Sequence, residues 1–328
     1  MRIIGMGLLA ALWSAQATAC INTPATDNGG RGFVPENYTG EALVEMLTRP
    51  REERYWIASR ETVIADARRD PSFEHLTELG VLLLLQNRLP AAVRLFVAMG
   101  RIFPGRYQTA SNLGTALELM GQDRAALRWI RIGIQRNRDS HQGSEWLHAR
   151  ILEAKIALAA DPGTLGARSV AGVMFDPVAL PSLPDRFPPG NDGKPVTAPQ
   201  LNHALAYQLG ERLQFVKPKD PVVANLLDDW ATLNLAGGPV ETAAALYRLS
   251  WRYGAARTPL SVARENRARQ AIAQRGHRSI DDRNLGFCSI CFPLADPEQH
   301  ATAPSAKPEG WKPGDPPPPP PPPPPYRQ

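Results

Sequence analysis

Residues 73–106 read FEHLTELGVLLLLQNRLPAAVRLFVAMGRIFPGR, and residues 107–140 read YQTASNLGTALELMGQDRAALRWIRIGIQRNRDS. The two stretches align without a gap at a spacing of 34 residues. The pairs that match at this spacing are Leu79-Gly80 with Leu113-Gly114, Leu83 with Leu117, Ala92 with Ala126, and Phe96 with Ile130. A fixed period of this length is typical of stacked helix pairs, which present an extended surface to a partner.

Each unit has the pattern of two helices joined by a turn. In the first unit, polar residues 86–88 separate two apolar faces that both have helical spacing. Gly80 and Ala92 are small where the two helices would cross, and Pro104 ends the unit because proline cannot continue a helix. The second unit repeats this arrangement but has Arg138 where the closing proline is expected.

This pattern resembles the tetratricopeptide repeat (TPR) family, in which a Leu-Gly pair, a turn, a small residue and a closing proline recur. The resemblance implies an all-α fold, a right-handed superhelix of antiparallel helix pairs. Shifting the register extends the array in both directions. Residues 51–69 resemble the second helix of a preceding incomplete unit, and residues 144–160 resemble a first helix with no ordinary second helix after it.

A weaker unit follows after a gap. Asp220-Pro221 is a typical helix start, Gly237-Gly238 ends that helix, and Gly254 is a predicted C-cap of the next helix. The Leu-Gly pair is missing in this unit. The expected organisation is a signal peptide (1–19), an irregular N-terminal segment (20–50), the TPR array (51–160), a Pro/Gly-rich connection (161–198), a second TPR-like helical segment (199–275), and a tail with a C-x-x-C motif and polyproline (276–328).

In TPR proteins the concave face, formed by the first helix of each unit, commonly binds peptides. The resemblance therefore gives a set of ten partner-contact candidates, which are Glu74, Thr77, Glu78, Val81, Leu84, Gln108, Ser111, Asn112, Thr115 and Glu118. The set contains no basic residue, which argues against the Lys/Arg clamp with which some family members hold a C-terminal carboxylate. A neutral-to-acidic groove favours a polar or basic partner segment. The alternative is that these residues are merely exposed and that binding uses the convex side.

The N-terminus has the pattern of an export signal. Arg2 precedes an apolar run, and Ala17-Thr18-Ala19 matches a small-residue cleavage site just before Cys20. The run is too short to span a bilayer, so we expect an exported protein without a membrane span, in the periplasm or at the outer membrane. Ordinary cleavage is one interpretation. Lipidation of Cys20 is the other, although Ala17 stands where bacterial lipoproteins usually have leucine.

Cys288 and Cys291 form a C-x-x-C motif. A structural disulfide is the favoured interpretation, because the motif lacks the strand-helix-strand surroundings that a thioredoxin-like enzyme needs. Thiol-disulfide exchange remains the alternative. Zinc would need two further ligands with suitable spacing, and haem would need His after the second cysteine, where the chain has Phe292.

Other chemical signals are weak. His141, Glu145 and His148 share one predicted helical face, yet we interpret this as incidental and expect no metal. The net charge of +5 includes Arg264 and Arg267, which we place on a solvated helix face, so nucleic-acid binding is not expected.

The sequence thus favours a binding protein, and neither an enzyme nor a cofactor is expected. The leading hypothesis is an exported bacterial scaffold or adaptor that binds an envelope protein, and the alternatives are thiol-disulfide exchange or a lipid-anchored assembly factor. Ten consecutive prolines (316–325) predict a stiff polyproline rod, which is either a ligand or spacer or a tail without a selected role. The oligomeric state is not predicted.

Overall fold

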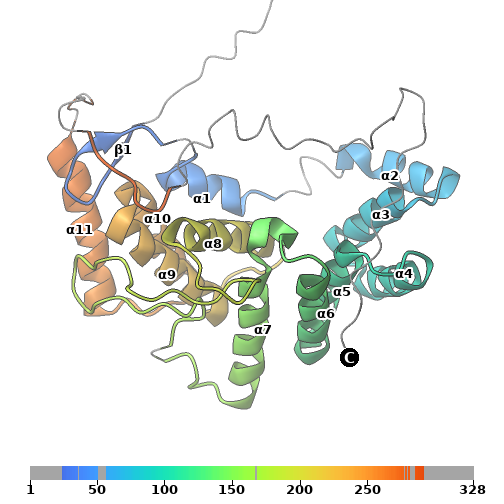
Figure 1. Cartoon of the computed structure of the whole chain (residues 1–328). Helices are drawn as coiled ribbons and strands as arrows, with labels where there is room; N and C mark the ends of the chain where they lie inside the picture. Colours follow the sequence, from blue (N-terminus) through green and yellow to red (C-terminus); the bar gives the residue numbers. More distant parts are fainter. Residues whose placement is uncertain are drawn as a thin grey trace, which may run out of the picture.

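The computed structural model describes residues 24–35, 37–50, 57–166, 168–276, 278, 280 and 285–291. In these residues the chain is predominantly helical, with eleven α-helices, one short 3-10 helix and a two-stranded hairpin (Figure 1). The predicted all-α class is therefore confirmed. No helix of the described part is long and apolar enough to cross a membrane. The predicted signal segment, Cys20 and the polyproline stretch lie outside the described residues.

The two units of the sequence repeat form four consecutive helices with matching bounds. They are α3 (Phe73–Leu85), α4 (Leu89–Ile102), α5 (Tyr107–Leu119) and α6 (Asp123–Arg136). The backbone of the turn also repeats. Arg88 N donates to Leu83 O at 2.8 Å in the first unit, and Gln122 N donates to Leu117 O at 2.8 Å in the second. Each turn has one residue in the left-handed region, which is Asn87 (φ 55°) and then Gly121 (φ 73°).

The helices of each unit cross where the sequence has its Leu-Gly pair. A Cβ added to Gly80 would lie 2.4 Å from two ring carbons of Phe96, and one on Gly114 would lie 2.5 Å from Ile130 Cδ1. Phe96 and Ile130 are both 0% exposed. The glycines therefore let a large side chain from the second helix of each unit pack against the backbone of the first.

The array is preceded by α2 (Ile57–Arg69), which packs on α3. The segment expected to be irregular contains a hairpin, β1 (Ala25–Thr26) with β2 (Gly32–Phe33), and a helix, α1 (Gly40–Thr48). This segment packs against the second half of the chain. Thr26 Oγ1 donates to Glu241 Oε1 at 2.6 Å, and Leu43 and Leu47 of α1 are buried. The helix is short and its apolar pattern spans few residues, which is why the sequence indicated no element here.

Helix α7 (Glu145–Ala160) lies between the two halves of the molecule (Figure 1). Ala149 and Leu152 are buried in the core of the repeat units, which we call the first core. Trp146, Leu147 and Ile151 are buried in a second core, which the remaining helices form. One helix thus contributes to both cores, from different faces.

The second core is built on four helices, which are α8 (Ala198–Arg212), α9 (Pro221–Gly237), α10 (Val240–Tyr253) and α11 (Pro259–Arg275). The predicted start of α9 is confirmed, since Asp220 Oδ1 accepts from Val223 N at 2.8 Å. Gly254 caps α10 in the left-handed region at φ 109°. Arg264 was expected on a solvated face, and this was wrong. Its side chain is buried and donates to Asp176 O at 2.6 Å and to Val178 O at 3.1 Å, so it anchors the connection instead.

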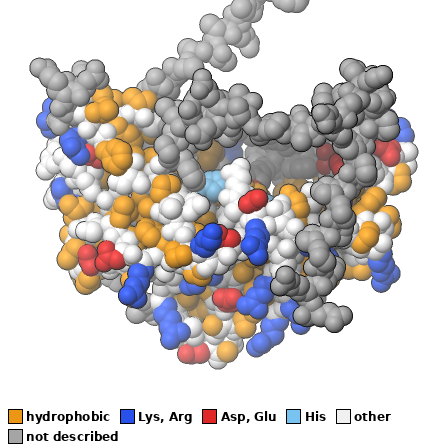
Figure 2. Space-filling model, in the orientation of Figure 1, with side chains coloured by type: hydrophobic (Ala, Val, Ile, Leu, Met, Phe, Trp, Pro, Cys, Tyr) orange, Lys and Arg blue, Asp and Glu red, His pale blue; other side chains and the backbone are white. Residues whose placement is uncertain are grey.

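The connection after α7, residues 161–198, packs in part against the helices of the second core. Val170 and Val173 are each 4% exposed, within the second core. Ser169 Oγ donates to Asp229 Oδ2 at 2.7 Å, and Val170 N donates to Asn225 Oδ1 at 2.8 Å. The charged side chains on the face seen in Figure 2 are of both signs and are interspersed over its lower part.

Candidate functional site

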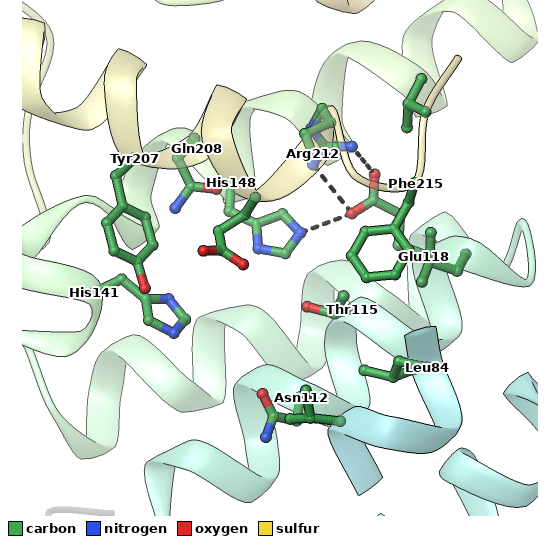
Figure 3. Close-up of a pocket in the computed structure, with 14 residues that line it drawn as sticks. Leu84, Asn112, Thr115, Glu118, His141, His148, Tyr207, Gln208, Arg212 and Phe215 are labelled. Atoms are coloured by element: carbon green, nitrogen blue, oxygen red, sulfur yellow. Dashed lines mark hydrogen bonds and ion pairs between the residues drawn. The ribbon is translucent and has the colours of Figure 1, made fainter. Parts of the chain in front are cut away.

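A cavity of about 130 Å³ lies where the repeat helices α3 and α5 meet α7 and α8 (Figure 3). Five of the ten partner-contact candidates line it, namely Val81, Leu84, Asn112, Thr115 and Glu118. We call it the groove cavity. The repeat period explains the convergence, because positions 81 and 115, as well as 84 and 118, are equivalent positions in the two units.

The other five candidates lie outside this cavity. Glu74 and Glu78 are exposed, Gln108 is half-buried, and Thr77 Oγ1 donates to Phe73 O within its own helix at 2.7 Å. Ser111 is 1% exposed, because it lies under Gly133 of α6. A Cβ added to Gly133 would lie 2.6 Å from Ser111 Oγ.

The opposite wall of the groove cavity comes from α8 and the residues after it. Tyr207, Gln208, Glu211, Arg212, Phe215 and Val216 supply this wall. Phe215 also packs against the first core. The repeat period did not predict these residues, since they are far from the repeats along the chain. The one sequence signal for this wall was the predicted helical segment 199–275 after the gap in the array.

Glu118 is the centre of a buried network of charges. Arg212 holds both oxygens of its carboxylate, at 2.5 Å from Nη1 and 3.2 Å from Nη2. His148 Nε2 lies 2.7 Å from Glu118 Oε2, and Lys155 Nζ donates to Oε1 at 3.0 Å. Lys155 Nζ also forms an ion pair with Asp123 Oδ1 at 2.8 Å. The acidic charge expected at this end of the groove is therefore neutralised by basic residues of the same chain.

The network fixes the charge of its members. Burial alone would raise the pKa of Glu118, but the Arg212 guanidinium and the hydrogen bond from His148 hold this pKa well below its usual range. Burial would lower the pKa of His148, but hydrogen bonds to Glu118 and Glu145 raise it to about 9. His148 is therefore a cation at neutral pH, and its Nε2 donates to Glu118 Oε2.

His141 stands at the other end of the cavity. It lies in the short 3-10 turn η2 (Ser140–Gly143), where its φ of 51° is unusual for a residue with a side chain. Its ring stacks on Tyr207 at 5.3 Å between centroids, and its Nδ1 hydrogen-bonds Glu145 Oε2. Glu145 Oε1 also lies 3.5 Å from His148 Nδ1. His141, Glu145 and His148 thus contact one another, and the described residues contain no group of three or more His, Cys, Asp or Glu side chains placed to hold a metal ion.

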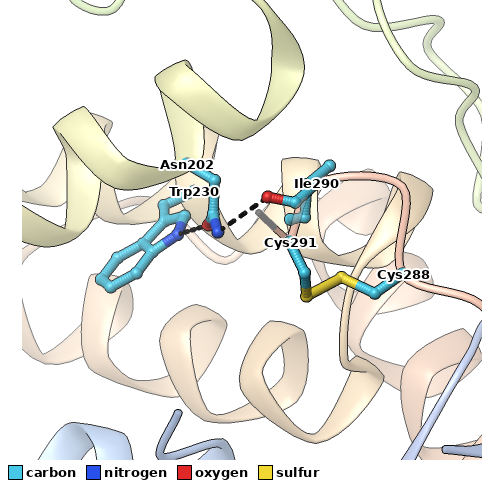
Figure 4. Close-up of a disulfide and its surroundings, with 5 residues drawn as sticks. All are labelled: Asn202, Trp230, Cys288, Ile290 and Cys291. Carbon is cyan, nitrogen blue, oxygen red and sulfur yellow. Dashed lines mark hydrogen bonds between the residues drawn. A yellow bond between two sulfur atoms is a disulfide. The ribbon is translucent and has the colours of Figure 1, made fainter. Parts of the chain in front are cut away.

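The predicted Cys288–Cys291 disulfide is confirmed. It belongs to a loop, residues 285–291, that has no regular secondary structure and therefore places neither cysteine at a helix N-terminus. Ile290 between the cysteines is 0% exposed, and its carbonyl accepts from Asn202 Nδ2 at 3.2 Å (Figure 4). The disulfide thus closes a loop whose central side chain is part of the second core.

A scan of the chain against models of known protein families finds no match. A search of the curated proteins likewise finds no match. The interpretation of the groove cavity therefore depends on the repeat in the sequence and on the geometry described above.

Proposed function

We propose that this chain is a TPR-type binding protein, an exported scaffold or adaptor of the bacterial cell envelope that holds a protein partner at the groove cavity. The observation that carries the proposal is the convergence of five predicted contact residues on one cavity. Two equivalent rows of residues approach it, Glu74, Glu78 and Val81 on α3, and Gln108, Asn112 and Thr115 on α5. Each row has the spacing i, i+4, i+7 and so follows one face of its helix.

The cavity and its approach suggest the character of the partner. Val81, Leu84, Leu119, Phe215 and Val216 make much of the lining apolar. Burial of an apolar side chain there is favourable, by about 25 cal/mol for each Å² removed from water. The exposed carboxylates of Glu74 and Glu78 lie on the approach and attract positive charge. We therefore expect a partner segment with an apolar anchor residue next to Lys or Arg.

The test is crosslinking of the mature protein in native envelope fractions, followed by mass spectrometry, with matched charge reversals. Glu78→Lys changes the approach to the groove. Glu61→Lys makes the same change on α2, at an exposed position outside the cavity. We expect Glu78→Lys to lose the partner and Glu61→Lys to keep it. If both variants keep every partner, the proposed site is wrong. Glu118→Lys is unsuitable, because it would break the buried network.

Thiol-disulfide exchange remains a second proposal for Cys288 and Cys291. The disulfide that the two cysteines form is compatible with it, whereas their position away from any helix N-terminus favours a structural role. An insulin-reduction assay together with thiol titration distinguishes the two roles. A bond that resists a glutathione buffer and a protein that does not reduce insulin would exclude exchange.

Anchoring by lipid at Cys20 is a separate part of the proposal. Mass spectrometry of the mature N-terminus tests it directly. A diacylglyceryl adduct on Cys20 would make the protein a lipid-anchored assembly factor, and an unmodified N-terminus after Ala19 would make it a freely exported one.

A further inference from the structure

A second, larger cavity of about 370 Å³ lies in the other half of the molecule, away from the repeats. The N-terminal segment, the helices α8, α9 and α10, and the loop of residues 285–291 surround it. Its lining includes Phe33, Tyr38 and Met46 from the N-terminal segment, Trp230 from α9, and the disulfide of residues 285–291. We call it the Trp230 cavity.

The described residues that line the Trp230 cavity are uncharged, since none of them is Asp, Glu, Lys or Arg. They include His203, and partial burial lowers the pKa of this imidazole, which favours the neutral ring at neutral pH. A charged ligand would lose its hydration without gaining an ionic partner among these residues, which is costly, whereas a neutral apolar ligand avoids this cost.

Several polar groups in the wall of the cavity form hydrogen bonds with other parts of the protein. Asn202 Oδ1 accepts from Trp230 Nε1 at 2.7 Å (Figure 4). Asn234 Nδ2 donates to the Trp230 carbonyl at 2.9 Å. Thr242 Oγ1 accepts from Gly40 N at 3.0 Å. These bonds hold the indole of Trp230 and the N-terminal segment in place, so the apolar surfaces between them are fixed before any ligand binds.

Apolar side chains stay exposed around the cavity. The exposed fractions are 48% for Val34, 66% for Tyr38 and 48% for Met46, and all three residues line it. Exposed apolar side chains gathered around one cavity are typical of binding sites in soluble proteins. The volume is also in the range of about 300–1,000 Å³ that is usual for small-molecule sites.

From these observations we propose that the Trp230 cavity binds an uncharged, largely apolar small molecule that packs against the exposed side chains of Val34, Tyr38 and Met46. This site is separate from the groove cavity. It does not depend on the proposed partner binding, and either proposal can fail without the other.

The test uses the neutral dye N-phenyl-1-naphthylamine, whose fluorescence rises in apolar surroundings, titrated with the oxidised protein. Met46→Asp places a charge at the cavity, and Tyr38→Ala removes an aromatic wall at a position that is too exposed to disturb folding. Met174→Asp is the matched control, because Met174 is 88% exposed and does not line the cavity.

We expect saturable binding by the original protein and by Met174→Asp. Binding should be about tenfold weaker in Met46→Asp and in Tyr38→Ala, because each loses apolar contact or gains an unpaired polar group. The anionic dye 8-anilinonaphthalene-1-sulfonate should compete poorly. The absence of saturable binding, or equal affinities of Met46→Asp and Met174→Asp, would overturn the proposal. Glu78→Lys should leave dye binding unchanged, which separates this test from that of the groove.

Discussion

Replacing Gly80 with alanine tests the packing on which the repeat units depend. The new Cβ would lie 2.4 Å from Phe96 Cε1 and Cζ, whereas carbon atoms in contact are normally about 3.5–4.0 Å apart. Phe96 is 0% exposed, so its ring is enclosed by other protein atoms and cannot turn out into solvent. Overpacking of this kind costs about 1–3 kcal/mol. Alanine in a helix interior is more favourable than glycine by about 1 kcal/mol, which offsets part of this cost. The net result expected for Gly80→Ala is destabilisation by up to about 2 kcal/mol.

Gly100 provides the matched control. It is an exposed glycine within α4, and the nearest atom to an added Cβ is Thr109 Cγ2 at 3.9 Å, which is ordinary contact. Gly100→Ala should therefore gain helix propensity alone and stabilise the protein by about 0.5–1 kcal/mol. The double variant Gly80→Ala/Phe96→Leu should lose less stability than the sum of its two single changes, because the smaller side chain relieves the overlap.

The assay is urea unfolding followed by far-ultraviolet circular dichroism, with the free energy of unfolding extrapolated to water. The two glycine variants should shift the midpoint in opposite directions. If Gly80→Ala is as stable as Gly100→Ala, the helices of the first unit do not cross at Gly80 as described, and the explanation of the Leu-Gly pair is refuted.

Three further results are expected. Arg212→Met should lower the free energy of unfolding in urea by about 3–5 kcal/mol, because it leaves the buried Glu118 carboxylate without its guanidinium partner. The double variant Arg212→Met/Glu118→Leu should lower it by less than Arg212→Met alone. The pKa of His148 is raised in the folded state to about 9, so its contribution to stability is fully present below about pH 6.5 and is lost as the pH rises through 9. His148→Gln should therefore weaken the fall in the free energy of unfolding at alkaline pH. An unchanged pH profile of stability would contradict this. Cys288→Ser/Cys291→Ser should cost about 2 kcal/mol or less, because the closed loop is short, and should speed amide hydrogen exchange mainly in that loop, which mass spectrometry can localise.

Local features of the fold could be predicted because their causes are local. The helix start at Asp220-Pro221 requires only a capping side chain and a proline next to it, and the left-handed end of α10 requires only Gly254. The turn in each repeat likewise depends on a few adjacent residues. In all these cases the residues that determine the structure lie within one or two helical turns of it.

The candidate site could be predicted only in part, for the same reason. The repeat period identified the wall of the groove cavity formed by α3 and α5. The other wall depends on how α8 packs, and the ion pair that fixes it joins residues 94 positions apart, Glu118 and Arg212. Arg264 shows the same limit, because a chain of polar contacts with the distant residues Asp176 and Val178 makes its burial favourable.

The two buried faces of α7 have a consequence for how the molecule can be divided. A fragment that ends before Glu145 would leave the first core without Ala149 and Leu152, and one that begins after Ala160 would leave the second core without Trp146. Each half therefore depends on the same helix for its completion. The two cores should consequently melt in a single calorimetric transition, and neither the repeats nor the later helices should form a stable independent module.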